Sequence, residues 1–330
     1  MINFYANKTV LVTGATGLIG SNLIDILMQL GANVIALCRN ENKATLVFDK
    51  YLKNHSFRYI IQDISNEILI DDEVDFVFHA AGPISGEVIR NQPVDVICPN
   101  IFGTKNCLDF LKKQKETRGI NGRLVLFSSA TVYGENNLNT NKIVTESDTE
   151  LSDKLHSPMV SYSQSKRMAE VLATSYYKQY GVDVVIARFS YVYGYAKFLP
   201  KTAFYDFIKK ALNNEDIVMN NACLPRRDNI YVTDAINGVL CICEKGISGE
   251  AYNISSNNEL ENYSAMDEIA NMISEVAKHD FGKKVNVLFK TDIVSERNAG
   301  IIMDNRKLKQ LDWVLKYSLR GGIKEIFTKI

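Results

Sequence analysis

The chain has 330 residues with 38 basic and 38 acidic side chains, so its formal net charge is zero. This balance gives no reason to expect a nucleic-acid partner or a membrane surface, and no apolar run approaches the roughly 18 residues of a spanning helix. The first residues lead almost at once into a strand and leave no room for a signal peptide, so we expect a cytoplasmic protein. Six scattered cysteines indicate buried free thiols, and four isolated histidines show no metal-ligand spacing.

The first predicted element is a β-branched strand over 10–13 that enters the turn Gly14-x-x-Gly17-x-x-Gly20, followed by an amphipathic helix. Gly14 would allow the turn, Gly17 would let the backbone approach a pyrophosphate, and Gly20 would let the helix pack against the strand. The phosphates would lie at the helix N-terminus, where free N–H groups and the helix dipole favour anions. The strand before the turn and the helix after it favour a dinucleotide site over a loop that merely turns.

Further strands are predicted at 33–38, 57–64, 74–82, 123–129 and 182–189, with helical or polar connections between them. One helix is predicted over 100–113, with Pro99 in an irregular first turn, and another over 162–180. This alternation predicts an α/β fold, a doubly wound parallel sheet of the Rossmann type. After Gly194 the pattern is less regular, and amphipathic helices over 199–212, 265–277 and 319–330 predict a smaller C-terminal lobe.

A tyrosine and a lysine are spaced for chemistry in the segment Tyr162-Ser163-Gln164-Ser165-Lys166. Residues four apart share one face of a helix, so the lysine cation can stand beside the phenol and lower the pKa of the tyrosine. Such a tyrosine can act as a general base or acid near neutral pH. The spacing alone also fits a surface pair. The catalytic interpretation is favoured because the strand over 123–129 ends in two serines at the carboxyl edge of the sheet, where ligands bind.

With these pieces in order, the chain resembles the extended short-chain dehydrogenases/reductases of the nucleotide-sugar epimerase/dehydratase family. The matching segments are Gly14-x-x-Gly17-x-x-Gly20, Asp63-Ile64, His79-Ala80-Ala81-Gly82, Asn100 with Gly103-Thr104, Ser128-Ser129-Ala130-Thr131-Val132-Tyr133-Gly134, Tyr162-x-x-x-Lys166, Arg188-Phe189 with Tyr193-Gly194, Arg227-Asp228-Asn229-Ile230-Tyr231-Val232-x-Asp234, Ala251-Tyr252-Asn253-Ile254, and the tail over 304–313. The resemblance implies an NAD(P)-dependent enzyme with a nucleotide-sugar substrate, in the setting of polysaccharide or glycan precursor synthesis. It also implies a homodimer formed through the helices that contain 100–113 and 162–180.

The resemblance further implies a domain division and roles for single residues. Residues 1–193 with a returning segment at about 228–256 would bind the dinucleotide, and residues 194–227 with 257–330 would bind the nucleotide sugar. The catalytic residues would be Ser129, Tyr162 and Lys166. The cofactor-binding residues would be Gly14, Thr16, Gly17, Leu18 and Ile19 at the turn, Asp63 and Ile64 at the adenine, and Ala80, Ala81 and Ser128 along the nicotinamide ribose, which Lys166 also contacts beside Tyr162. The substrate-binding residues would be Thr131, Ser190, Arg227 and Arg297, with Arg227 on the pyrophosphate. Arg297 stands where a second phosphate arginine is expected, and the alternative is that it is a surface arginine.

The strand over 33–38 departs from the family pattern at its end, where NAD-using members commonly carry an acidic residue for the adenosine ribose. Here Cys38 is followed by Arg39. An arginine at this position can pair with a 2′-phosphate, and no carboxylate is present to repel it. We therefore expect NADP to be favoured and NAD to be possible. The alternatives are that Arg39 stacks on the adenine or faces solvent.

The residues after the catalytic serine bear on the reaction type. Family 4,6-dehydratases carry Asp-Glu there and the similar decarboxylases carry a glutamate, whereas this chain has Ala130-Thr131, as in the 4-epimerases. Ser190 stands where many members have a substrate-contacting asparagine. We expect a 4-epimerase that works by transient C4 oxidation, with an NADPH-dependent 4-ketoreductase or dehydrogenase as the nearest alternative. A dehydratase or decarboxylase is less favoured, and the intact triad argues against a dinucleotide-sensing protein without activity.

Overall fold

The computed structural model describes residues 4–83, 86–134, 143–148, 153–220, 226–291 and 300–330. Its centre is a seven-stranded sheet in the order β11-β7-β5-β4-β1-β2-β3, in which every pair of neighbours is parallel. The strands are β1 (Thr9–Thr13), β2 (Asn33–Cys38), β3 (Phe57–Ile61), β4 (Phe76–His79), β5 (Arg123–Ser129), β7 (Asp183–Phe189) and β11 (Ala251–Ile254). This order confirms the doubly wound α/β sheet predicted from the sequence.

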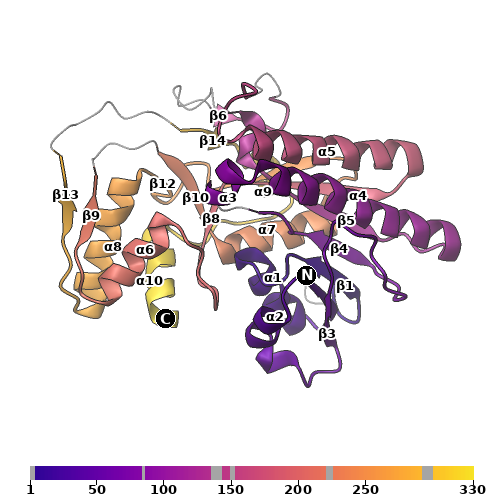
Figure 1. Ribbon diagram of the computed structural model, residues 1–330, viewed down its shortest axis with the longest axis horizontal. Coiled ribbons are helices and arrows are strands. Elements are labelled where there is room, and N and C mark those ends of the chain that lie inside the picture. Colours follow the sequence, from indigo (N-terminus) through magenta and orange to yellow (C-terminus); the bar gives the residue numbers. More distant parts are fainter. Residues whose placement is uncertain (1–3, 84–85, 135–142, 149–152, 221–225, 292–299) are drawn as a thin grey trace.

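Helices cover both faces of this sheet (Figure 1). Helices α1 (Leu18–Gln29) and α7 (Val232–Lys245) lie on one face, and α4 (Pro93–Arg118) and α5 (Val160–Tyr180) lie on the other. Side chains alternate between the faces along β1, so Val10 and Val12 join one core with Leu23 of α1, and Leu11 joins the other with Leu108 of α4. Burial on both faces explains why the strands read as continuous apolar runs.

Helix α4 begins earlier than the sequence predicted. It starts at Pro93, and Pro99 lies inside it rather than in its first turn, so that prediction was wrong. Pro93 suits the first turn, where its missing N–H leaves no bond unmade. Pro99 does remove one interior hydrogen bond. Buried residues on both sides of it, Val96 and Asn100, hold this part of the helix against the rest of the domain.

The segment predicted as a strand over 57–64 is shorter in the structure, because β3 ends at Ile61. Asp63 lies in the turn that follows, where its Oδ1 accepts a hydrogen bond from the Ser65 amide at 2.8 Å. A local side-chain bond of this kind competes with the strand ladder and ends it.

A second lobe stands beside the sheet, at the left of Figure 1. It consists of helices α6 (Ala203–Leu212), α8 (Met266–Phe281) and α10 (Leu319–Lys329) and of the parallel strand pair β9 (Ile217–Met219) and β13 (Val287–Phe289). A small sheet in the order β12-β10-β8 connects the two parts, with β8 (Tyr191–Tyr193), β10 (Arg227–Tyr231) and β12 (Tyr263–Ser264). The shorter elements are α2 (Glu41–Val47), η1 (Asp49–Tyr51), α3 (Gly86–Asn91), η2 (Ala130–Tyr133), β6 (Ile143–Val144), β14 (Ile302–Met303) and α9 (Arg306–Lys309).

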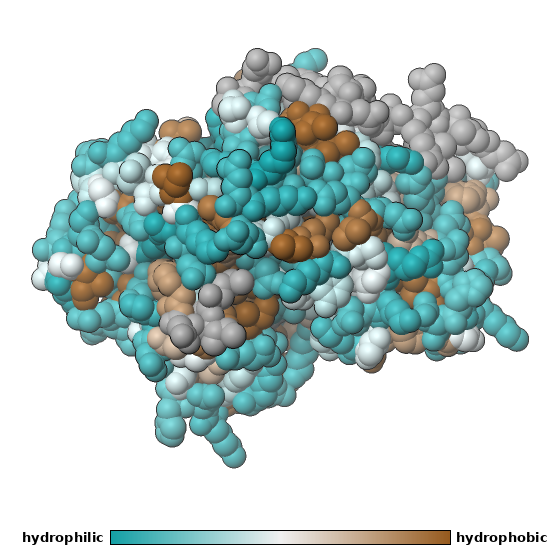
Figure 2. Space-filling model, turned by 180° about the vertical axis from the view of Figure 1, so that it is seen from behind, coloured by the Kyte–Doolittle hydropathy of each residue, from teal (hydrophilic) through white to brown (hydrophobic). Residues whose placement is uncertain are grey.

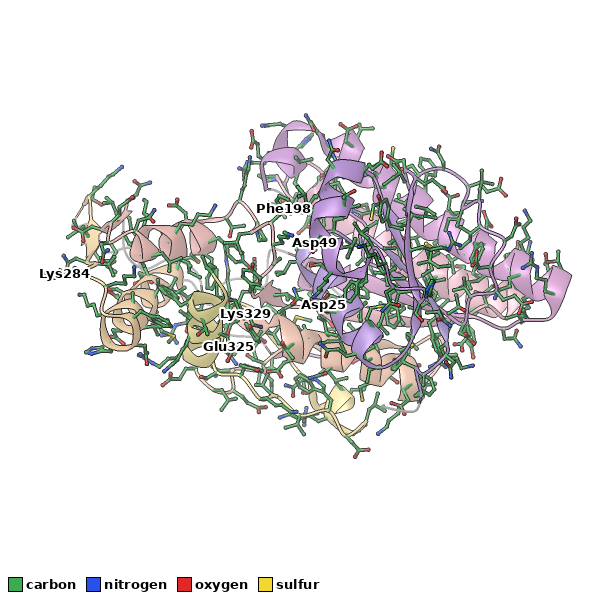
Figure 3. All side chains as sticks on the ribbon, turned by 90° about the horizontal axis from the view of Figure 1, so that it is seen from below. Asp25, Asp49, Phe198, Lys284, Glu325 and Lys329 are labelled. Atoms are coloured by element: carbon green, nitrogen blue, oxygen red, sulfur yellow. The ribbon has the colours of Figure 1, made fainter. Side chains whose placement is uncertain are left out.

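The segment that leads from β8 into the second lobe packs against the sheet domain. Lys197 Nζ lies 3.1 Å from a carboxylate oxygen of Asp49, at the start of η1. The next residue, Phe198, lies beside Asp49 in the view from below (Figure 3), and Lys43 Nζ of α2 is 5.4 Å from the centre of its ring. In the same view Glu325 and Lys329 mark α10 on the lobe side.

The surface is mixed, and hydrophilic residues cover most of the face shown in Figure 2. In the part of the chain that the structure describes, no helix combines the length and hydrophobicity required to cross a membrane. Cys38, Cys107, Cys241 and Cys243 are buried and free, as predicted, and Cys98 is free and half-buried. Cys223 lies outside the described residues.

Candidate functional site

The glycine turn brings the loops after β1 and β4 into close contact. Gly14 has a φ of +64°, and a Cβ built on it would lie 2.6 Å from the carbonyl carbon of Ala80. A Cβ on Gly20 would lie 2.5 Å from the Gly14 carbonyl oxygen. Because these are backbone atoms that cannot move aside, only glycine fits at either position. These roles agree with those predicted from the sequence for the turn and for the helix that packs on the strand.

Gly17 differs from the other two glycines because it borders open space. Its amide donates to the Gly14 carbonyl at 3.0 Å, and a Cβ built on it would meet one heavy atom of the described chain within 4 Å, that same carbonyl oxygen at 3.2 Å. Gly17 caps α1 without a side-chain hydrogen bond, and the first turn of α1 carries no acidic residue. Thr16, Leu18 and Ile19 are half-buried around it. The N-terminus of α1 is therefore open to an anion, and these residues fit the pyrophosphate of a dinucleotide.

Ser129, Tyr162 and Lys166 converge at the carboxyl edge of the sheet. Ser129 is the last residue of β5, and its side chain lies close enough to the phenol of Tyr162 to lower the pKa of that tyrosine. Lys166 follows one turn later on α5, with Nζ 5.9 Å from the centre of the Tyr162 ring. Its ammonium donates to the Phe127 carbonyl at 2.9 Å. A serine hydroxyl, a phenol and an ammonium in one place can hold a substrate oxygen and move its proton.

Burial dominates the protonation of this trio. It raises the pKa of Tyr162, the neighbouring Ser129 side chain lowers it, and the Tyr191 phenol raises it further. Burial also lowers the pKa of Lys166 to about 8, while the Glu170 carboxylate opposes this. The sequence predicted that Lys166 would lower the pKa of Tyr162. The net direction for Tyr162 is the opposite, because desolvation of the phenolate outweighs the favourable contacts.

A buried ionic cluster lies directly beneath the trio. Glu170, one turn after Lys166 on α5, accepts hydrogen bonds from Arg188 Nε at 2.9 Å and Nη2 at 2.8 Å. It also accepts from Ser128 Oγ at 2.6 Å and from Arg167 Nη1 at 3.1 Å. Arg188 Nη1 donates in addition to the Tyr133 hydroxyl at 3.0 Å. The Ser128 side chain, which was expected along the nicotinamide ribose, is thus engaged inside the protein.

Gly82 marks a close approach between α4 and the trio. A Cβ built on it would lie 2.6 Å from Asn100 Oδ1 and 3.4 Å from Lys166 Nζ. Asn100 Nδ2 donates to Ser165 Oγ at 2.9 Å, but its Oδ1 is buried with no partner in the described chain. A buried acceptor of this kind can take a donor from a ligand or a water.

The loop after β4 is fixed to the end of β1 by a short chain of hydrogen bonds. Thr13 Oγ1 lies 2.7 Å from His79 Nδ1 and accepts from the Ala81 amide at 3.3 Å. Burial lowers the pKa of His79 to about 3, so the ring is neutral. Ala80 and Ala81, expected along the nicotinamide ribose, are half-buried between the glycine turn and Lys166.

The residues expected around the adenosine occupy different environments. Arg39 is exposed and forms no ion pair within the described ranges, while Asn40 beside it caps α2 by accepting from the Lys43 amide at 2.8 Å. Asp63 is exposed in the turn after β3. The side chain of Ile64 is 3% exposed and belongs to the core.

Among the expected substrate residues, Thr131 lies in η2, Ser190 directly precedes β8, and Arg227 begins β10 in the small connecting sheet. Thr131 Oγ1 and Ser190 Oγ are buried and have no hydrogen-bond partner in the described chain. Arg227 is exposed, and its guanidinium carbon lies 4.6 Å from the centre of the Tyr191 ring. Arg297 lies outside the described residues.

Three residues near the site were not identified as site residues from the sequence. Glu170 had a detectable signal, because it lies four residues after Lys166 and so on the same helical face. Arg188 was noticed as part of a motif, but its buried pairing was not. Tyr191 had no local signal, since its neighbours become apparent only when β8 pairs with β10.

Known proteins share the sequence pattern and the fold of this chain. The model of the NAD dependent epimerase/dehydratase family matches residues 10–255. UDP-glucuronic acid decarboxylase 6 of Arabidopsis thaliana is 29% identical, over 97% of this chain and 88% of its own length. The epimerase Mth375 of Methanothermobacter thermautotrophicus superposes with a TM-score of 0.80 at 22% identity, over 99% of this chain and 93% of its own. The dTDP-glucose 4,6-dehydratase of Bacillus anthracis, whose structure is a complex with NAD, gives 0.77 at 23%, over 97% and 96%. The chain belongs to the NAD dependent epimerase/dehydratase family.

Proposed function

We propose that this protein is an NAD(P)-dependent enzyme that inverts the configuration at C4 of a nucleotide-activated hexose. The similar proteins include a decarboxylase, an epimerase and a dehydratase, so membership of the family alone does not select a reaction. One observation carries the choice: Ser129, Tyr162 and Lys166 meet at the sheet edge, and the residues that follow Ser129 carry no carboxylate.

The surroundings of the trio support a reaction without elimination. Thr131 stands where dehydratases of the family carry an acidic residue, and its hydroxyl cannot serve as a carboxylate would. Glu170 is the carboxylate beneath the trio, and it accepts from two arginines and a serine. Both oxygens of this carboxylate are engaged by these donors inside the protein, so it is not placed to act on a substrate.

In the proposed reaction, each of these residues has a separate role. When bound, the dinucleotide supplies a ring that accepts a hydride and can return it. Tyr162 takes the proton of the 4-hydroxyl and later gives it back, Ser129 holds the same oxygen, and Lys166 keeps positive charge beside the phenolate. Arg227 would retain the diphosphate while the 4-keto sugar turns over, with residues 194–227 and 257–330 as the nucleotide-sugar lobe and 1–193 with about 228–256 as the dinucleotide domain.

The experiment is an assay with UDP-, GDP-, dTDP- and CDP-hexoses, read by NMR for the configuration at C4. Exchange in at least one of them is expected, and its absence in all would overturn the proposal. Tyr162→Phe should reduce turnover by about 10²- to 10⁴-fold and leave cofactor binding intact. A sensor without activity would show no turnover in the parent protein.

NADP is the cofactor that we propose, although the Bacillus anthracis structure contains NAD. Arg39 supports this, because it is exposed at the end of β2 with no counter-ion among the described residues. Fluorescence titration should show tighter binding of NADPH than of NADH, and Arg39→Ala should remove most of the difference. Equal or tighter NADH binding by the parent protein would contradict it.

The same Arg39 observation favours a second function, an NADPH-dependent 4-ketoreductase or dehydrogenase with the same trio, because NADPH commonly serves as a consumed reductant. The two functions differ in cofactor stoichiometry. A ketoreductase consumes the absorbance of the reduced nicotinamide in proportion to product, whereas an epimerase shows no net change.

We also propose that the protein is a homodimer joined through α4 and α5. These helices lie side by side on the outer face of the sheet (Figure 1) and expose Val94 and Phe102 on α4 and Met168 and Val171 on α5. Single exposed apolar residues are ordinary, but several on one helical layer favour an interface. Sedimentation should give the dimer mass, and Phe102→Glu with Val171→Glu should give the monomer. A monomeric parent protein would contradict the proposal.

A further inference from the structure

Tyr191 lies where the catalytic sheet leads into the second lobe. Strand β7 ends at Phe189, opposite Ser129 of β5, and β8 begins two residues later at Tyr191. In the small connecting sheet, Tyr191 pairs in register with Asn229 of β10, which places it close to Arg227 at the start of that strand. The backbone therefore brings one aromatic ring to the boundary between the trio and the lobe.

The side chain of Tyr191 points out of the protein. It is 50% exposed, whereas Ser190 before it and Tyr193 after it are buried. Phe189, two residues before it, pairs in register with Ser129 of the trio, and the Tyr191 phenol raises the pKa of Tyr162. On its other side, the guanidinium carbon of Arg227 is 4.6 Å from the centre of its ring. The ring therefore neighbours both the catalytic phenol and a cation of the lobe.

Arg227 has its charge available. Arg226, the residue before it, donates from Nη2 to Glu268 at 2.6 Å, but Arg227 forms no ion pair with the part of the chain that the structure describes. Stacking on an aromatic ring engages the face of a guanidinium and leaves its N–H groups, which lie in the plane, free. Such a group can bind two oxygens of an anion at once.

We propose that Tyr191 is a substrate-positioning residue that holds Arg227 for the diphosphate and packs its ring against the hexose beside Tyr162. The inference rests on the proposed function for the class of ligand, a nucleoside diphosphate sugar. It adds a residue that couples the two halves of the substrate, because one ring contacts the cation at the phosphates and borders the residue at C4. A flat apolar ring suits the C–H face of a pyranose, and its position next to Arg227 fixes the distance between phosphate and sugar.

The experiment is calorimetric titration of the full chain, with reduced dinucleotide present, by UDP, GDP, dTDP and CDP and by the corresponding glucose derivatives. Tyr191→Ala should lower the affinity for the best-binding nucleoside diphosphate by about tenfold. It should lower the affinity for the corresponding sugar derivative by a clearly larger factor. Tyr191→Phe should keep both within about twofold. Tyr180→Ala, which removes an exposed tyrosine at the far end of α5, should leave both unchanged.

The contact between Tyr191 and Arg227 is tested by comparing the single variants with the double variant. Arg227→Ala should lower the affinity for the diphosphate at least as much as Tyr191→Ala does. The double variant should bind the bare diphosphate no more weakly than Arg227→Ala does. Equal losses for diphosphate and sugar derivative would overturn the sugar contact. Unchanged affinities in Tyr191→Ala, or no binding of the four diphosphates to the parent protein, would overturn the whole inference. Because binding is measured apart from turnover, an inactive protein that still shows these losses would refute the proposed epimerisation and leave this inference intact.

Discussion

Two polar regions meet at the trio, and they differ in how far their hydrogen-bonding groups are satisfied. Below it, both oxygens of the Glu170 carboxylate accept hydrogen bonds, and the guanidinium of Arg188 is shared between Glu170 and Tyr133. Around it, Asn100 Oδ1, Thr131 Oγ1 and Ser190 Oγ are buried with no partner in the described chain. Unpaired buried groups cost stability. The fully hydrogen-bonded region below the trio can hold the geometry of the site, and the region around it has polar atoms that a bound molecule could pair with.

The largest expected effect comes from breaking the satisfied region. Arg188→Met leaves the Glu170 carboxylate buried without its bidentate partner and should lower the free energy of unfolding by about 3–5 kcal/mol. Urea denaturation measures this. The double variant Glu170→Leu with Arg188→Met should recover a large part of the loss, because neither member of the buried pair remains and Arg167, which also loses Glu170, is partly exposed.

The exposed pair of Lys324 and Asp280 provides the control for that experiment. Lys324→Met should change the free energy of unfolding by no more than about 0.5 kcal/mol, since water screens exposed pairs. A loss in Arg188→Met as small as that of Lys324→Met would show that the cluster does not fix the site.

The glycine turn permits a second comparison of fixed with open structure. Gly14→Ala puts a Cβ 2.6 Å from backbone atoms at a φ of +64° and should cost about 3 kcal/mol or more. Gly17→Ala meets only the Gly14 carbonyl, at 3.2 Å among described atoms, and should cost less than about 1 kcal/mol. Its dinucleotide affinity should nevertheless fall at least tenfold. Thermal unfolding and cofactor titration measure the two effects, and unchanged affinity in Gly17→Ala would mean that the pyrophosphate lies elsewhere.

Lys166 sits between the two regions, and its replacement should stabilise the protein. Burial lowers its pKa from 10.5 to about 8, so at pH 7 the folded chain carries a desolvated cation. Lys166→Met should raise the free energy of unfolding by about 2 kcal/mol, after allowing for the lost bond to the Phe127 carbonyl, and should abolish activity.

The pH dependence checks the sign of this effect. Between about pH 8 and 10.5 the unfolded chain binds the lysine proton and the folded chain does not, so the stability of the parent protein rises with pH in this interval. The advantage of Lys166→Met should therefore shrink over the same interval. If the difference in the free energy of unfolding between Lys166→Met and the parent protein stayed constant over this interval, Lys166 would not be desolvated in the folded protein.

The same contrast explains what the sequence could predict. Strands β1, β2, β5 and β7 were predicted because burial on both faces makes them continuous apolar runs. Tyr162 and Lys166 were brought together by helical spacing, and Ser129 by the rule that parallel strands share a carboxyl edge. Each of these inferences depends on local periodicity or on a general property of the fold.

Features that depend on distant contacts escaped prediction. Tyr191 meets Arg227 only because β8 pairs with β10, and no local pattern marks that pairing. The pKa of Tyr162 moves upward because of burial, which spacing along a helix does not report. The early start of α4 at Pro93 reflects packing around Pro99 that propensity alone argues against.

The smallest expected effect on stability comes from the open region. Thr131→Val replaces an unpaired buried hydroxyl by a methyl group of similar shape, so the free energy of unfolding should stay the same or rise by up to about 1 kcal/mol. The apparent KM for the nucleotide sugar should rise several-fold, because the hydroxyl is then missing where a substrate oxygen would pair with it. Val132→Thr, which adds a hydroxyl to a buried position beside it, serves as the opposite change and should lower stability. If Thr131→Val instead lost 1 kcal/mol or more with an unchanged KM, this hydroxyl would belong with the fixed network below the trio, and the boundary between the two regions would have to be redrawn above Thr131.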